Sequence, residues 1–147
     1  MRLSNGKTDV VVLDDLQLVR VNISGEMVAA DLEGCYSARS TPDVRSYNSL
    51  YDFRNCIFHT SIFDLYNFPR TSPQMQAGGC KTVKVALLTN RDENYEKLKF
   101  YETTSNNVGF NSKVFTCEQK AIIWLTNHNF SQSETDFDSF QKNNVTC

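Results

Sequence analysis

The chain of 147 residues has little proline or glycine, with three and six residues respectively. This scarcity excludes collagen-like and low-complexity sequence. The longest hydrophobic runs, at 10–13 and 121–125, fall well short of the roughly 18 residues that a membrane-spanning helix needs, so no membrane span is expected. Because this length suits one hydrophobic core, we expect residues 1–147 to form a single globular domain.

An excess of either charge is also missing. Fifteen Lys and Arg residues face 17 Asp and Glu residues, which gives a formal net charge of −2. Without a basic field, nucleic acid is not an expected partner. The first residues, Met1–Ser4, lack the apolar core of a secretory signal, so localisation stays open between the cytosol and a mature secreted fragment.

Histidine is scarce as well, with only His59 and His128. Neither has a second histidine two or four residues away, and the cysteines form no Cys-x-x-Cys pair, so no metal site is expected. The sequence has no Gly-x-Ser-x-Gly motif and no phosphate-binding glycine loop, and nothing in it selects a catalytic pair of carboxylates. We therefore expect no enzymatic activity, no cofactor and no metal.

The oxidation state of the cysteines is left open by the sequence. The five cysteines are Cys35, Cys56, Cys80, Cys117 and Cys147. Two disulfides with one unpaired thiol, or five reduced cysteines, fit this spacing equally. Three glycosylation sequons begin at Asn22, Asn129 and Asn144. These sequons would be used only if the protein is secreted.

Branched and aromatic residues are abundant. Val, Ile, Phe, Tyr, Trp and Thr total 46 residues, whereas Ala contributes only six. Such side chains fit a half-buried pleated surface, while a helical domain would normally use more alanine. Asn5-Gly6 predicts a hairpin between residues 1–4 and 8–13. The alternation of apolar and other residues from Val83 to Leu87 predicts a strand.

Other segments complete an expected β fold. Further strands are expected at 16–23, 98–101, 108–115 and, as a central strand, 120–126, with strand core material at 56–58 and 62–63. A break in the alternation between Leu18 and Val19 indicates a β-bulge or, alternatively, a helical turn across 13–19. Residues 26–32 fit a strand or a short helix. Residues 34–51 are typical of a long surface loop, and 127–147 of a loosely packed polar tail. Together these segments predict an all-β domain, an antiparallel β-sandwich such as a jelly roll, with long polar loops.

The polar loops of such a sandwich would suit sugar recognition. An aromatic face packs against the apolar side of a sugar ring, and planar polar groups bind its hydroxyls. Trp124 lies in an apolar run and is expected in the core. The candidates expected to be more exposed are Tyr36, Tyr47, Tyr51, Asn127 and His128.

Residues 83–125 resemble the H-type lectin domain, the β-sandwich module of snail agglutinins, discoidins and some fungal lectins. The stretches that carry the resemblance are Val83–Leu88, Asn90–Glu96, Leu98–Thr104, Asn107–Phe110 and Ile122–Leu125, preceded by Phe68-Pro69. The resemblance implies a lectin-like sandwich and assembly into trimers. The sequence departs from the family at Lys97, where the family has arginine, and at Cys117, where it usually has an aromatic residue.

We therefore expect a non-enzymatic, carbohydrate-binding protein that is multivalent through oligomerisation and acts in cell adhesion, with glycans or glycoproteins as partners. The residues expected to bind the ligand are Asp64, Asn94, Lys97 and His128. Two alternatives remain: a structural protein such as a coat or matrix subunit, and a protein-binding effector or inhibitor that uses the loop at 34–51.

Overall fold

The computed structural model describes residues 2–4, 8–39, 42–72 and 83–126 of the chain. Its strands are β1 (Arg2–Ser4), β2 (Thr8–Leu13), β3 (Leu18–Met27), β4 (Asn48–Phe58), β5 (Lys84–Leu88) and β6 (Asn111–Phe115). Its α-helices are α1 (Ala29–Arg39), α2 (Ile62–Thr71), α4 (Glu93–Asn106) and α5 (Glu118–Thr126). Short 3₁₀ turns lie at Asp14–Leu16 and Pro42–Val44.

All six strands form one sheet, in the order β1-β2-β3-β4-β5-β6. The first three strands are antiparallel to one another, and β3 to β6 run parallel. Parallel neighbours need a crossover connection, and α1 and α4 complete such crossovers from β3 to β4 and from β5 to β6. The fold is therefore mixed α/β, and the prediction of an all-β antiparallel sandwich is wrong.

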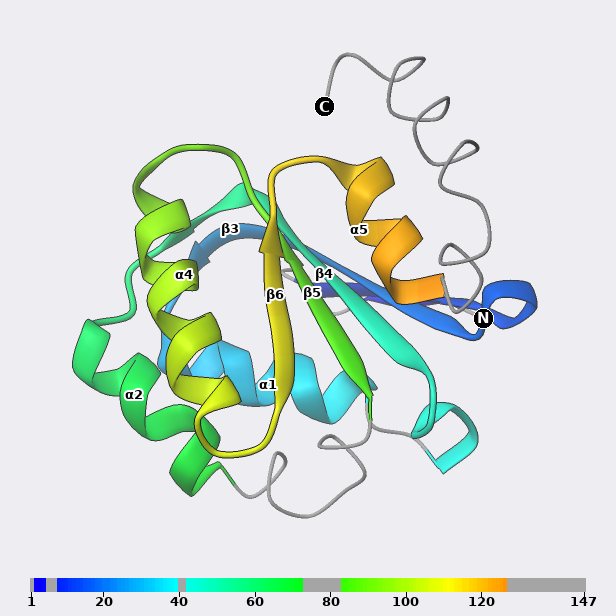
Figure 1. Cartoon of the computed structure of the whole chain (residues 1–147), viewed down its shortest axis with the longest axis horizontal. Helices are drawn as coiled ribbons and strands as arrows, with labels where there is room; N and C mark the ends of the chain where they lie inside the picture. The colour runs from blue at the N-terminus through cyan, green and yellow to red at the C-terminus, as the bar shows by residue number, and fades with distance from the viewer. Residues whose placement is uncertain (1, 5–7, 40–41, 73–82, 127–147) are drawn as a thin grey trace.

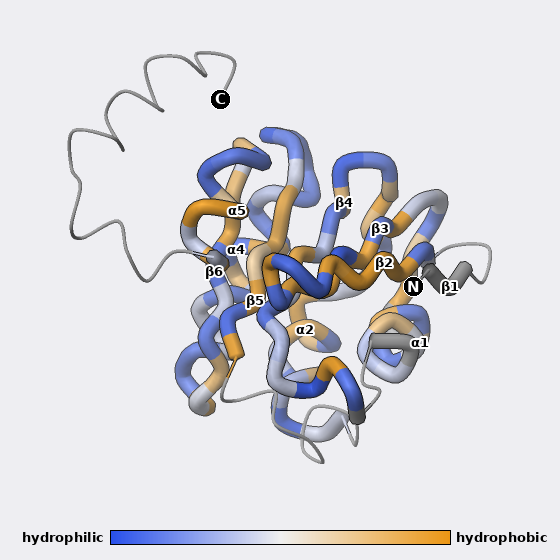
Figure 2. Tube along the Cα trace, turned by 90° about the vertical axis from the view of Figure 1, so that its right-hand side faces the viewer, coloured by the Kyte–Doolittle hydropathy of each residue, from blue (hydrophilic) through white to orange (hydrophobic). Residues whose placement is uncertain are grey.

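Helices cover both faces of the sheet (Figure 1). The larger core cluster joins one face of the sheet to α1, α2 and α4, and the smaller cluster joins the other face to α5. Figure 2 shows hydrophobic residues concentrated along the strands, whereas many turns between elements are hydrophilic. Because β5 is covered on both faces, all of its residues from Val85 to Leu88 are apolar.

The first misread helix is α4, within which residues 98–101 were predicted to be a strand. The residues that α4 buries include Asn94, Leu98, Tyr101 and Ser105, spaced by four, three and four residues. This spacing is a helical stripe, but two of its four members are polar. Hydrophobic residues therefore mark only half of this stripe, and the sequence pattern alone does not predict a helix here.

The second misread helix is α5, predicted as a central strand at 120–126. Its buried residues Ala121 and Leu125 are four apart and pack on Leu18, Leu50 and other residues of the smaller core cluster. A short run that is apolar all round fits a buried strand and a buried helix equally well. Trp124 is only partly buried there, packed against the smaller cluster, so it lies at the edge of the core.

Several local predictions are confirmed. Strands β1 and β2 form the hairpin around Asn5-Gly6, and strands fall where 83–87 and 108–115 predicted them.

The break between Leu18 and Val19 is not a bulge, because the two side chains enter the two core clusters on opposite faces. The irregularity in β3 lies further along, between Asn22 and Ser24.

Other local predictions are wrong. The expected loop at 34–51 contains most of α1 and the start of β4, and residues 62–63 begin α2 rather than a strand. Ser61 caps α2, because its Oγ accepts a hydrogen bond from the backbone N–H of Asp64 at 3.1 Å. Tyr36 and Tyr51, expected to be exposed, are buried in the larger core cluster. The predicted loose tail at 127–147 lies outside the described residues.

The outer edge of β6 is occupied by side chains of α4. Asn106 accepts a hydrogen bond from the backbone N–H of Ser112 at 2.8 Å and donates one to its carbonyl at 3.0 Å. The carboxylate of Glu102 accepts from the backbone N–H of Val114 at 2.7 Å. These contacts use the groups with which an edge strand would pair with another chain.

Candidate functional site

The carboxyl ends of β5 and β6 meet at one edge of the sheet, where the backbone N–H of Thr89 donates to the carbonyl of Phe115 at 3.0 Å. From these neighbouring ends the chain leaves in opposite directions, because α4 packs on one face of the sheet and α5 on the other (Figure 1). In open α/β sheets, diverging connections of this kind open a crevice in which ligands bind.

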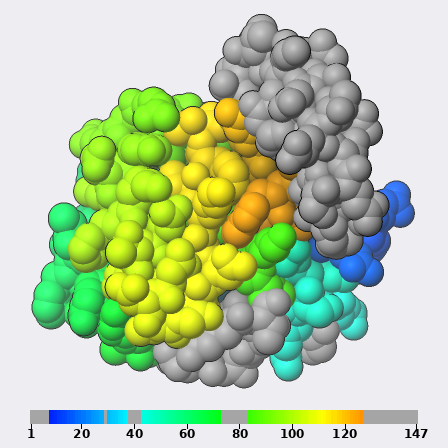
Figure 3. All heavy atoms as spheres, viewed as in Figure 1, coloured from blue at the N-terminus to red at the C-terminus, as the bar shows by residue number. Residues whose placement is uncertain are grey.

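A cleft of about 360 Å³ occupies this position. Its lining residues are Arg91, Tyr95, Val114, Phe115, Thr116, Cys117 and Lys120. Figure 3 shows the first turn of α4 (yellow-green) and the junction of β6 with α5 (yellow to orange) on the same face. Volumes of roughly 300–1,000 Å³ are usual for small-molecule sites, so the cleft is large enough for a small ligand.

The charge of the cleft is positive. Among the described residues that line it, Arg91 and Lys120 are cations and none is a carboxylate. The guanidinium of Arg91 lies 5.0 Å from the centre of the Tyr95 ring, which holds it close to an aromatic wall. The cleft therefore combines positive charge with an aromatic surface.

Two helices begin beside the cleft. The carboxylate of Asp92 caps α4 by accepting from the backbone N–H of Asn94 at 2.9 Å. At the start of α5, the Sγ of Cys117 accepts from the backbone N–H of Lys120 at 3.4 Å. The positive end of a helix dipole favours an anion, so α5 adds to the charge of Lys120 in the cleft.

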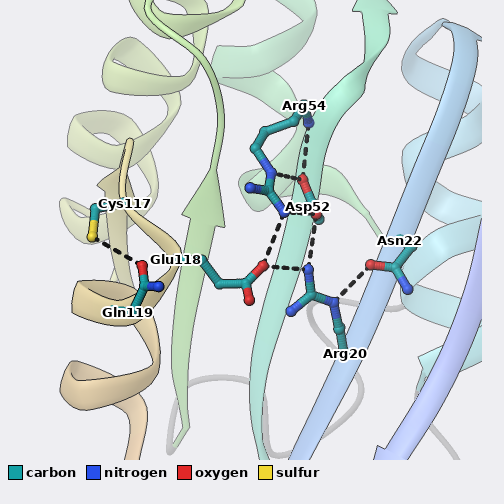
Figure 4. Close-up of polar contacts among 7 residues, drawn as sticks. All are labelled: Arg20, Asn22, Asp52, Arg54, Cys117, Glu118 and Gln119. Carbon is teal, nitrogen blue, oxygen red and sulfur yellow. Dashed lines mark hydrogen bonds and ion pairs between the residues drawn. The ribbon is translucent and has the colours of Figure 1, made fainter. Parts of the chain in front are cut away.

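On the sheet face beside the start of α5, four charged side chains form a closed network (Figure 4). Asp52 on β4 and Glu118 on α5 each accept hydrogen bonds from both Arg20 on β3 and Arg54 on β4. The four distances lie between 2.8 and 2.9 Å. This network, which we call the charged clamp, links three elements that are far apart in the sequence.

Of the two carboxylates in the clamp, that of Asp52 is the more buried. Burial raises the pKa of its carboxyl, but hydrogen bonds from the side chain and backbone of Arg54 and the charges of Arg54 and Arg20 outweigh burial. The pKa of Asp52 is therefore lowered from its ordinary value of 3.8. Conversely, the hydrogen bond to Asp52 raises the pKa of Arg54.

This lowered pKa predicts a loss of stability in acid. A carboxyl group whose pKa is lower in the folded chain stabilises the fold above its unfolded pKa, near 4, and loses this effect as the pH falls through the folded pKa. The free energy of unfolding should therefore decrease below about pH 4, and Asp52→Asn should flatten this decrease. Urea unfolding between about pH 5 and pH 2 measures the two slopes, and equal slopes would contradict the assignment.

Two of the residues predicted to bind a glycan serve as tethers between α4 and β4. Asn94 is buried, and its side chain bonds the backbone N–H of Phe58 and the backbone carbonyl of Cys56. The Nζ of Lys97 donates to the carbonyl of Phe58 at 2.6 Å. Neither residue lines the cleft described above.

The other two predicted residues lie apart from this pair of tethers. Asp64 is exposed in the first turn of α2. His128 lies outside the described residues, as does Asn127. The sequon residue Asn22 is on β3, where its Oδ1 accepts from the Nε of Arg20 at 2.8 Å.

The cleft residues themselves were missed by the sequence analysis. Arg91 follows a strand that was predicted correctly, and it would have been recognised as part of a strand-to-helix connection only if α4 had been recognised. Lys120 opens the apolar run at 120–126 that predicts a strand, so the sequence does not show that a helix begins there. In both cases the site residue was missed because a strand was predicted within the helix that follows or contains it, α4 or α5.

Two of the five cysteines are reduced in the structure. Cys35 and Cys56 are free and buried, so Cys117 is joined to neither of them, while Cys80 and Cys147 lie outside the described residues. Burial raises the pKa of both free thiols, that of Cys56 to about 12. At neutral pH these two thiols are therefore protonated and poorly nucleophilic.

Comparisons with known proteins assign the chain to no family. No family model and no curated protein sequence matches the chain. One similar solved structure is an uncharacterised protein of the DUF3478 family with a SpoIIAA-like fold from Shewanella loihica PV-4, at 16% identity and a TM-score of 0.49. The similarity covers 84% of this chain and 98% of that one.

The resemblance to the H-type lectin domain is wrong, because the described chain forms a mixed α/β sheet rather than a β-sandwich. Two of the segments that carried it, residues 98–104 and 122–125, were aligned with strands of a sandwich but lie in the helices α4 and α5. The expectations of a lectin, a β-sandwich and a role in cell adhesion lose their basis with it. None of the helices that the structure describes is long and apolar enough to cross a membrane.

Proposed function

We propose that the protein is a non-enzymatic binding protein that holds a small anionic ligand, such as a phosphate ester or a carboxylate. The observation that carries this proposal is the cleft at the carboxyl ends of β5 and β6. Arg91 and Lys120 line it without a carboxylate among its described lining residues, and α5 begins beside it. Cations and a helix N-terminus together favour an anion.

The aromatic side chains narrow the class of ligand. Tyr95 and Phe115 give the cleft an apolar surface next to its cations. A ligand that combines an anionic group with a sugar or aromatic ring would use both features. Sugar phosphates and sugar acids belong to this class, and assembly into oligomers would add avidity for ligands displayed on a surface.

The side chains of the cleft are better suited to binding than to general acid–base catalysis. Histidine and carboxylate side chains are the groups that most often act as general bases. The described residues lining the cleft include neither type. Binding and release are therefore the functions that this set of side chains supports best.

Substitutions of the two cations test the proposal. Arg91→Ala and Lys120→Ala should each weaken the binding of phenyl phosphate by about tenfold, because each removes a charged donor from the anion. Isothermal titration calorimetry measures the affinities for phenyl phosphate and for inorganic phosphate. The difference between the two gives the contribution of the phenyl ring to the affinity. The matched control is Arg45→Ala, an exposed arginine near the amino end of β4, at the opposite edge of the sheet.

The control variant should bind as the unaltered protein does. If the unaltered protein binds neither anion at millimolar concentration, or if Arg45→Ala weakens binding as much as Arg91→Ala, the cleft is not the anion site.

A further inference from the structure

Glu118 connects the start of α5 to the sheet through the charged clamp. A single oxygen of its carboxylate accepts from Nη2 of Arg20 at 2.8 Å and from Nη2 of Arg54 at 2.9 Å. Asp52, whose side chain is 7% exposed, binds both arginines from the other side. Glu118 is therefore held by two guanidinium groups that are themselves held in place.

The side chains of the first turn of α5 point in two directions. Figure 4 shows Glu118 reaching across β5 toward Arg54 and Arg20, while Cys117 lies on the opposite side of the helix start. Cys117 and Lys120 line the cleft. The clamp thus holds this turn from the sheet side and leaves its other side to the cleft.

The far end of α5 is attached independently. The side chain of Asn48 donates to the carbonyl of Leu125 at 2.7 Å, and the Nζ of Lys84 donates to the carbonyl of Trp124 at 3.1 Å. Buried apolar residues of α5 add to this attachment. Loss of the clamp should therefore loosen the first turn of α5 and leave the rest of the helix in place.

We propose that Glu118 is a positioning residue for the anion site: through Arg20 and Arg54 it fixes the first turn of α5, and with it Lys120, against the cleft. This inference rests on the proposed function. It assigns a role in binding to a negatively charged residue, although the ligand itself is an anion.

The sign of the effect separates positioning from simple electrostatics. Removing a negative charge close to an anion site strengthens anion binding if charge alone matters. Loss of positioning weakens binding, because the ligand must then also restrain the helix start. The two explanations predict opposite changes for the same substitution.

The test is Glu118→Gln, measured by titration calorimetry with inorganic phosphate. We expect the affinity to fall about fivefold, a coupling of the size found between residues of one network. Unchanged or tighter binding would overturn the inference. The matched control is Asp14→Asn, which changes the net charge equally at the opposite edge of the sheet and should leave the affinity unaltered.

A second variant covers the case in which Glu118→Gln does not fold. Glu118→Asp keeps the charge but shortens the side chain by one methylene group, so it cannot reach both arginines with the same helix position. If only the charge of residue 118 matters, Glu118→Asp should leave the phosphate affinity unchanged. If Glu118 positions the helix start, Glu118→Asp should weaken phosphate binding as Glu118→Gln does. Unaltered affinity in Glu118→Asp would equally overturn the inference.

A double-mutant cycle with Lys120→Ala gives the readout that a purely structural role would not change. If Glu118 acts through Lys120, the effect of Glu118→Gln on phosphate affinity should shrink to less than about twofold once Lys120 is absent. Full additivity would mean that Glu118 does not act through Lys120. If Lys120→Ala itself has no effect, the proposed function fails; if only the Glu118 variants have none, the positioning role alone fails.

Discussion

Replacement of Phe58 by alanine is expected to lower the free energy of unfolding by about 4 kcal/mol, within the range for phenylalanine in a core. Phe58 ends β4 and is 2% exposed. Its ring stacks on that of Phe53, with 5.6 Å between the ring centres. Truncation removes these contacts and leaves a cavity in the larger core cluster, so urea unfolding should show a lower midpoint.

Phe63 is the matched control for this prediction. It lies in the first turn of α2 and is 73% exposed, and Phe63→Ala should change the free energy of unfolding by no more than about 0.5 kcal/mol. The all-β prediction used residues 62–63 as core, whereas the observed fold leaves Phe63 at the surface. A loss of similar size in both variants would contradict the observed arrangement of β4 and α2.

Replacement of Asn94 by alanine is expected to cost about 3 kcal/mol of unfolding free energy, because two buried backbone groups of β4 lose their partners. The Oδ1 of Asn94 accepts from the backbone N–H of Phe58 at 3.1 Å, and its Nδ2 donates to the carbonyl of Cys56 at 2.9 Å. The side chain thus attaches the first turn of α4 to the end of β4. Thermal and urea unfolding of the variant measure the loss.

The control for Asn94 is Asn90, which makes a single exposed hydrogen bond from Nδ2 to the carbonyl of Arg54. Asn90→Ala should cost less than about 1 kcal/mol, because water can replace its side chain. Equal stability of Asn94→Ala and the unaltered protein would show that Asn94 is not a tether.

The sequence predicts those elements of the fold that depend on neighbouring residues, and it misses those that depend on contacts between distant residues. The hairpin around Asn5-Gly6 and the strand at 84–88 follow from local turn chemistry and alternation, and both were predicted correctly. Helix α4 depends on a buried stripe that includes Asn94 and Ser105, whose burial makes sense only once their partners in the fold are known. Composition rich in branched and aromatic residues then favoured strands where the chain forms helices.

The candidate site was beyond sequence analysis for a related reason. Arg91 and Lys120 belong to different strand-to-helix connections, and the parallel pairing of β5 with β6 brings them to one cleft. The clamp likewise joins Arg20, Asp52 and Glu118 from three elements. Polar residues such as Asn94 attract attention in a sequence, but burial assigns this one to the interior of the fold.

If the cleft at the carboxyl ends of β5 and β6 binds an anion, the amide signals of its lining residues should respond to phosphate. Titration of the ¹⁵N-labelled protein with inorganic phosphate, followed by amide chemical shifts in heteronuclear correlation spectra, tests this most directly. We expect saturable shifts concentrated at Arg91, Tyr95 and residues 115–120, with little change along α1 and α2. Absence of saturable shifts, or shifts centred on another part of the molecule, would contradict it.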